Sequence, residues 1–161
     1  MESVSGIKLC LKHYKESRAK LVRQVQELVN VRSQLTYVSS DMLQKAIGVD
    51  ITASRATYRL SSRLEELVSS IETTKAEIME AIATLTSKVP VKAKEALIDK
   101  DYLLNVVSQI AHQSALENII VDKLLSPDGA LIDPDSLTTY VACFDYPPYL
   151  VEADIDALLL I

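Results

Sequence analysis

Apolar residues recur at alternating steps of four and three through the first half of this chain, in two runs separated by a short turn. The first run covers positions 7–46 and is interrupted only by Arg18, Arg32 and Ser39, and the second covers positions 53–85. This spacing puts the apolar side chains on one face of a helix, and that face has to be covered by another helix. The pattern therefore predicts two long helices that press their apolar faces together.

The segment between the two runs has the residues of a helix end followed by a helix start. Gly48 is a helix stop, and Asp50 or Thr52 can cap the next helix, so we expect helices over about 5–47 and 52–88. A connection this short folds neighbouring helices back in an antiparallel hairpin. The alternative is one continuous helix through Gly48, which the cost of about 1 kcal/mol for an interior glycine disfavours. The expected seam consists of Leu21, Val25, Leu28, Leu35, Leu60, Leu64, Leu67, Ile71 and Ile78.

A third helical pattern follows the hairpin. Pro90 suits the first turn of a helix, and apolar spacing continues over 91–125, unless Asp99-Lys100-Asp101 breaks the helix and caps a new one. Ser126-Pro127-Asp128-Gly129 then predicts a turn. Residues 1–125 are therefore expected to form a bundle of the hairpin and a third helix.

The last part of the chain, residues 126–161, differs in composition, because it contains four of the five prolines. Asp133 followed by Pro134 predicts a short helix that reaches about Cys143, and the next residues are extended because they precede two prolines. The final segment, residues 151–161, is too apolar to be disordered and requires a surface to pack against. We expect this C-terminal part to dock on the bundle or on a partner.

The composition agrees with an all-α chain that has more apolar residues than a two-stranded coiled coil buries. Three glycines, five prolines, one phenylalanine and no tryptophan in 161 residues argue against a β-sandwich or barrel. Hydrophobic residues make up 48% of the chain, whereas a two-stranded coiled coil keeps only about two in seven positions apolar. The surplus requires cover from the third helix, from a second copy of the chain, or from other subunits.

The two parts of the chain differ in charge. Up to Arg63 there are eleven Lys and Arg against five Asp and Glu, and after it six against seventeen. Six cations fall within about four turns near the N-terminus: Lys8, Lys12, Lys15, Arg18, Lys20 and Arg23. This basic strip either docks an acidic partner, an anionic membrane or a nucleic acid, or is a solvated face or one matched to the acidic later helices. The net charge of −5 and the scarcity of interleaved aromatic residues argue against nucleic acid.

Two arginines of the seam, Arg18 and Arg32, allow two interpretations. Their stems can pack in the seam while the guanidinium groups reach solvent. They can instead pair with acidic residues of a neighbouring helix and set the register. Antiparallel folding would place Arg32 opposite Glu65 and Glu66, and we expect a contact there.

The sequence offers no motif for catalysis, a cofactor or a metal. There is no nucleophile elbow, no glycine-rich phosphate loop and no His-Glu-x-x-His pattern, so we expect no enzyme activity. Cys10 and His13 share a helix face, but His112 and Cys143 are too far apart in sequence to be a typical second pair of zinc ligands. We therefore expect neither a metal nor another cofactor.

One short segment of the tail, residues 146–150, combines two tyrosines with two prolines. Tyr146-Pro147-Pro148-Tyr149-Leu150 resembles the Tyr-Pro-x-x-Leu type of motif that recruits adaptors of the membrane-scission machinery, although Asp145 replaces its leading leucine. The resemblance covers five residues and implies an adaptor as partner. We favour the simpler interpretation of a proline-kinked segment that holds its aromatic residues on the bundle.

These features together favour a non-enzymatic scaffold or interaction subunit of an intracellular assembly, which binds other subunits or itself through helical apolar faces. No stretch of about 18 apolar residues and no signal-peptide core occur, and two distant cysteines suggest a reduced compartment, cytoplasmic or nuclear. The alternative is a peripheral membrane-surface or trafficking adaptor that uses the basic strip. The residues expected to contact a partner are Lys12, Lys15, Arg18, Arg23, Tyr146, Tyr149, Leu158 and Leu159.

Overall fold

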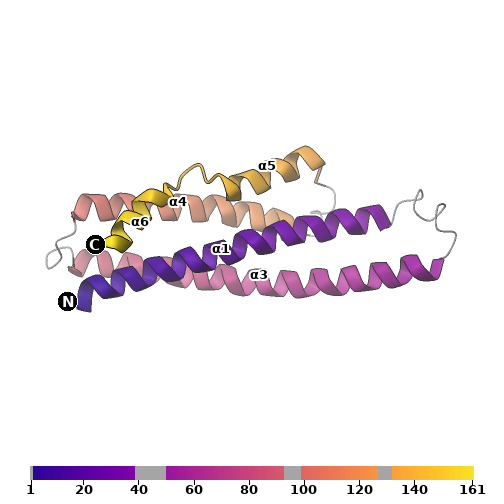
Figure 1. The fold of residues 1–161 in the computed structure, drawn as a ribbon, viewed down its shortest axis with the longest axis horizontal. Coiled ribbons are helices and arrows are strands. Elements are labelled where there is room, and N and C mark those ends of the chain that lie inside the picture. The colour runs from indigo at the N-terminus through magenta and orange to yellow at the C-terminus, as the bar shows by residue number, and fades with distance from the viewer. Residues whose placement is uncertain (1, 39–49, 93–98, 127–131) are drawn as a thin grey trace.

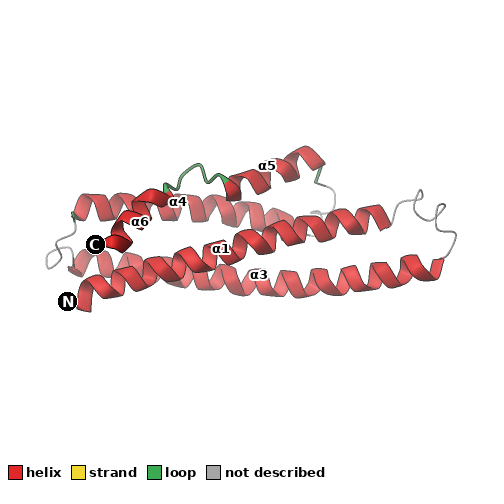
Figure 2. Ribbon diagram, viewed as in Figure 1, coloured by secondary structure: helices red, strands yellow, loops and turns green. Residues whose placement is uncertain are grey.

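The structure, a computed structural model, describes residues 2–38, 50–92, 99–126 and 132–161, and within these ranges it is helical without any strand (Figure 1, Figure 2). Its elements are α1 (Glu2–Val38), α3 (Asp50–Lys92), α4 (Lys100–Leu125), α5 (Pro134–Asp145) and α6 (Glu152–Leu160). The predicted all-α architecture is confirmed: a long hairpin, a third long helix beside it, and a short helical C-terminal part that contains prolines.

The hairpin is formed by α1 and α3, which lie side by side over most of their lengths (Figure 1). The 37 residues of α1 and the 43 of α3 make rods of roughly 55 and 65 Å. Lys20 pairs with Glu77 (Nζ–Oε2 3.9 Å), whereas the later residue Glu27 pairs with the earlier residue Arg63 (Oε1–Nη2 2.6 Å). The helices are therefore antiparallel, and a continuous rod is excluded. The predicted turn at Gly48 lies outside the described residues.

The expected seam is buried along most of its length. Leu21, Val25, Leu28, Leu67, Ile71 and Ile78 are all at most 3% exposed, whereas Leu35, Leu60 and Leu64 are half-buried. The difference follows from position, because the half-buried residues lie toward the C-terminal end of α1 and the N-terminal end of α3, where the hairpin extends beyond α4 and α5 (Figure 1). Two helices alone leave part of each seam residue in water, and a third helix is needed to cover the rest.

The predicted contact of Arg32 with Glu65 and Glu66 is wrong. No ion pair joins these three described residues, and Nε of Arg32 is buried without a hydrogen-bond partner in the described part of the chain. Arg63 pairs instead with Glu66 on its own helix (3.0 Å) and with Glu27 across the hairpin. Arg32 sits deeper in the seam than the solvated carboxylates, and burial lowers its pKa.

The boundary between the second and third helices also differs from the prediction. The second helix does not end before Pro90, because α3 continues through this residue to Lys92. A proline in the last turn of a helix removes only one backbone hydrogen bond, and neighbouring Val89 is buried in the core. The new N-cap considered at 99–101 is confirmed, since the Asp99 carboxylate accepts a hydrogen bond from the backbone N–H of Asp101 (3.0 Å) at the start of α4.

The C-terminal part packs onto the bundle, with α5 and α6 both against α1 and α4 (Figure 1). Asp133 caps α5 as predicted, because its carboxylate accepts a hydrogen bond from the backbone N–H of Ser136 (2.8 Å), and Pro134 occupies the first turn. Phe144, Leu150, Ile155 and Leu158 of this part are buried in the core, and partly buried residues such as Leu137 and Leu159 pack against it. The tail therefore lies on its own chain.

Candidate functional site

A buried ion pair joins α1 to α4 and also reaches the end of α5. Arg18 of α1 and Glu117 of α4 are only 6% and 2% exposed, and Nη2 of Arg18 lies 2.7 Å from Oε1 of Glu117. Nε of Arg18 also donates to this oxygen (2.9 Å), and Nη2 donates to the backbone carbonyl of Phe144 (2.8 Å). That carbonyl belongs to the last turn of α5, where carbonyls lack helical partners. Arg18 therefore fixes α4 and the end of α5 relative to α1.

Two glutamines of α4 extend this cluster toward the C-terminal segment. The amide of Gln113 donates to Glu117 (2.9 Å) and to the backbone carbonyl of Cys143 (3.2 Å), and its oxygen accepts from the backbone N–H of Tyr149 (3.2 Å). One turn earlier, Gln109 repeats the arrangement by accepting from the backbone N–H of Val151 (3.0 Å). The path of the chain between α5 and α6 is thus fixed by side chains of α4.

Burial shapes the ionisation of this cluster. Burial raises the pKa of Glu117, while the Arg18 charge and hydrogen bonds from Gln113 and Arg18 act in the opposite direction. Burial also raises the pKa of the nearby Tyr14 phenol, whose hydroxyl has no hydrogen-bond partner in the described part of the chain. Arg18, Gln113 and Glu117 are buried, Nη1 of Arg18 also lies 3.8 Å from the exposed Glu152, and the geometry of the cluster holds elements together.

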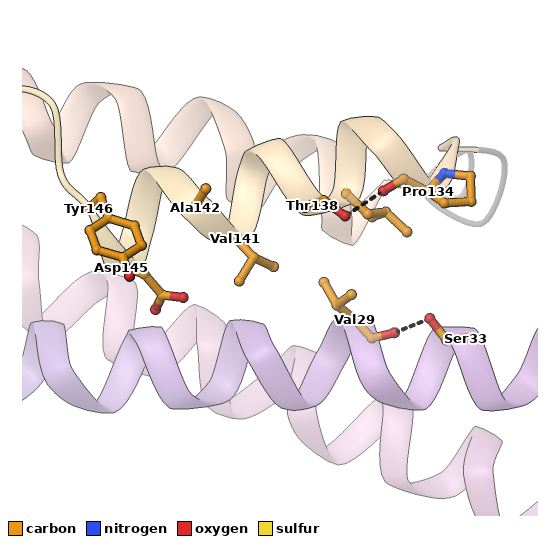
Figure 3. A pocket seen from close by; sticks show the side chains of 9 residues that line it. Val29, Ser33, Pro134, Thr138, Val141, Ala142, Asp145 and Tyr146 are labelled. Carbon is orange, nitrogen blue, oxygen red and sulfur yellow. Dashed lines mark hydrogen bonds between the residues drawn. The ribbon is translucent and has the colours of Figure 1, made fainter.

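An apolar groove opens between α1 and α5, next to the segment that this cluster holds. Its volume is about 410 Å³, and its walls are Val29 and Ser33 from α1 and Pro134, Leu137, Thr138, Val141, Ala142, Asp145 and Tyr146 from α5 and its end. Figure 3 shows the Val29 and Val141 side chains directed toward each other across the gap. Gln26 bridges the helices at one end by donating to the Asp145 carboxylate (2.8 Å).

The groove has an acidic border. Asp145 lines the groove and is exposed, and no Lys or Arg occurs anywhere in residues 124–161. Tyr146 is 82% exposed beside the groove and adds an aromatic ring that little else in the chain covers. A ligand for this groove therefore combines apolar side chains with positive charge.

The residues of the basic strip fall into different environments. Arg18 is buried, so it is not available to a partner, and the interpretation that it pairs with an acidic residue of a neighbouring helix is the one seen here. Lys15 pairs with Asp156 of α6, and Lys12 lies 3.9 Å from Glu16 of its own helix. Much of the strip is therefore matched to acidic residues of the chain itself.

Arg23 is exposed on α1 and remains open to a partner. In the tail, Tyr146 and Tyr149 are exposed as a partner contact requires. Leu158 is buried in the core and Leu159 is half-buried against it, so Leu158 is not a surface residue. The sequence does not show which side of α6 meets α1, and this is why it does not distinguish Leu158 from a surface residue.

The segment that resembles the adaptor-recruiting motif, residues 146–150, is anchored in the core by Leu150. The expectation that the aromatic residues are held on the bundle is wrong for Tyr146, which is 82% exposed, whereas the half-exposed ring of Tyr149 lies 6.0 Å from the ring of His112 on α4. The backbone N–H groups of Tyr149 and Val151 are bound by Gln113 and Gln109, so Leu150 between them is directed inward while Tyr149 and Val151 stay more than half exposed.

The four residues considered as zinc ligands are not assembled. Cys10 is a buried core residue, and the ring of His112 donates through Nδ1 to the backbone carbonyl of Ser108 (2.7 Å). Within the described ranges, no group of three His, Cys, Asp or Glu side chains is placed to hold a metal ion. None of the described helices combines the length and apolarity needed to span a bilayer.

Comparison of the chain with protein-family models, with curated proteins and with solved structures found no match. The site is therefore interpreted from its own geometry.

Proposed function

We propose that this chain is a non-enzymatic interaction subunit of an intracellular assembly, and that the groove between α1 and α5 receives a helical segment of another protein. The observation that carries the proposal is an apolar groove of about 410 Å³ whose outer wall, α5, is fixed by the buried Arg18–Glu117 cluster. A wall held in this way needs no ordering when the ligand arrives, so less affinity is lost on binding.

The chemistry of the groove defines its ligand. Val29, Leu137 and Val141 offer contact to two or three apolar side chains, which an amphipathic helix presents at spacings of three and four. The exposed carboxylate of Asp145 favours Lys or Arg at the edge of that helix. We infer a helix with an apolar face and basic borders.

The alternative function, a membrane-surface adaptor that uses the basic strip, has weaker support. Arg18 is buried, and Lys15 and Lys20 already pair with Asp156 and Glu77. Sedimentation with liposomes that contain acidic lipid separates the two proposals. Salt-sensitive pelleting that is lost in a Lys12→Ala, Lys15→Ala, Arg23→Ala variant would favour the adaptor.

The proposal is tested with two synthetic amphipathic helices that share one apolar face and carry either Lys or Glu at its borders. Fluorescence anisotropy is expected to show micromolar binding of the Lys helix and binding of the Glu helix that is at least about tenfold weaker. The variant Val141→Asp, in the wall of the groove, should abolish binding of the Lys helix. Met79→Asp, at an exposed apolar position on α3 away from the groove, is the control and should bind normally. Equal binding of both helices, or loss in the control, contradicts the proposal.

A further inference from the structure

The outward face of α4 is unusual among the helices because it carries no charge over four turns. Residues 102–116 contain no Asp, Glu, Lys or Arg, although the helix is open to solvent on one side. On that side Leu104 and Ile119 are 42% and 56% exposed. Exposed helix faces are normally rich in charged residues, so this face has the composition of an interface.

The exposed residues of this face have the same order in both directions along the helix. Large apolar residues stand at its ends, Leu104 and Ile119, and small ones stand inside them, Ser108 and Ala115. The midpoint of both pairs lies between Ala111 and His112. If an antiparallel copy of α4 is laid on this face about that midpoint, Leu104 meets Ile119 of the copy and Ser108 meets Ala115. Ser108, Ala111 and Ala115 are small, so the two helices can approach closely around the exposed His112, which meets Ala111 of the copy.

The charges that border the face are complementary under the same operation. Asp101 lies at the N-terminal end and Lys123 at the C-terminal end, both exposed, and an antiparallel copy brings each Asp101 next to the other's Lys123. Within its own chain Lys123 lies 5.8 Å from the centre of the Tyr140 ring, and no ion pair joins it to the other residues described here. A parallel copy would set like charges together, which is unfavourable.

We propose that two copies of this chain associate through α4 in an antiparallel, twofold-symmetric dimer centred between Ala111 and His112. The contact is isologous, so each favourable pairing occurs twice. Tyr149 and Val151 are more than half exposed at the edge of the face, where the His112 and Tyr149 rings lie 6.0 Å apart, and they widen the contact beyond a single helix. The groove between α1 and α5 uses other residues, so this dimer stands independently of the function proposed above.

Sedimentation velocity over a range of concentrations tests for the dimer. The wild-type chain is expected to shift from monomer to dimer as its concentration rises, and Ala115→Glu should weaken association at least about tenfold by placing two charges in the contact. Because Ala115 is exposed, this variant keeps its fold, which circular dichroism verifies. Met79→Glu on α3 is the matched control and should associate like the wild type. A wild-type chain that stays monomeric at all concentrations overturns the proposal.

Charge exchange and disulfide trapping test the orientation. Asp101→Lys or Lys123→Asp alone should weaken the dimer, and the double variant should restore it. In a Cys143→Ser background, Ala111→Cys should cross-link to itself, whereas Ser108→Cys and Ala115→Cys should cross-link only when the two variants are mixed. Self-cross-linking of Ala115→Cys alone contradicts the antiparallel arrangement. A double charge variant that dimerises more weakly than both single variants contradicts it as well.

Discussion

Replacement of Arg18 by methionine removes the connection between α1, α4 and the end of α5 while keeping an apolar stem of similar length. Glu117 then stays buried without its partner, which costs about 3–5 kcal/mol in proteins. The Phe144 carbonyl also loses its donor, and an unsatisfied buried acceptor costs about 1–3 kcal/mol. Because protonation of Glu117 relieves part of the penalty, we expect a total loss of about 4 kcal/mol in the free energy of unfolding at pH 7.5.

Urea unfolding followed by circular dichroism measures this loss, and a double-mutant cycle isolates the pair. Arg18→Met with Glu117→Leu removes both charges and should cost only about 2 kcal/mol, less than Arg18→Met alone. A loss below about 1 kcal/mol for Arg18→Met, or a double variant that equals the sum of its single variants, refutes the reasoning.

The pH dependence of the Arg18→Met variant gives a second test of the same cluster. Burial raises the pKa of Glu117 and Arg18 opposes this, so without Arg18 the folded-state pKa is higher still. The folded variant then holds its proton to higher pH than the unfolded chain, whose carboxyl titrates near about 4.3. Stability is therefore lost as the pH rises above the unfolded value toward the folded one. We expect the cost of Arg18→Met to be smaller at pH 4.5 than at pH 7.5, and a cost that shrinks as pH rises would contradict this.

Tyr14→Phe removes a buried hydroxyl without a partner and should leave the free energy of unfolding unchanged or raise it by up to about 1 kcal/mol, with a clear loss in urea melts as the contrary result. Because burial raises the pKa of Tyr14, the wild type should lose stability above about pH 10, where the unfolded phenol ionises, and the Phe variant should lose less. Leu28→Ala, at a fully buried seam position, should lower the free energy of unfolding by about 3 kcal/mol, and Leu35→Ala, at a half-buried one, by about 1 kcal/mol. Equal losses would contradict the decrease in side-chain burial along the hairpin. Asp133→Ala should loosen the start of α5, measured as faster amide exchange there than in α4.

The hairpin could be predicted because its signal extends over many turns. A spacing of three and four repeated along two runs fixes both the helices and the faces that meet, and a few polar interruptions do not change it. Single residues were less informative. Pro90 suggested a helix start, but the burial of Val89 carries α3 past it.

The candidate site was less predictable because it depends on contacts between distant segments. Glu117 lies 99 positions from Arg18, and although Ile110, Val121 and Leu124 at helical spacing place it on the apolar face of α4, the sequence does not name its partner. In α6, three leucines follow one another, so the sequence does not show that Leu158 faces the core while Leu160 faces outward. The groove likewise arises only when α5 is laid along α1.

The central claim is that the groove between α1 and α5 takes a helix with basic borders. Titration of the methyl-labelled protein with the Lys-bordered helix, followed by NMR, tests it most directly. We expect chemical-shift changes concentrated at Val29, Leu137 and Val141, with the Met79 methyl group unmoved. Shifts spread evenly over the hairpin, or none at these three groove residues at saturating ligand, would contradict the account.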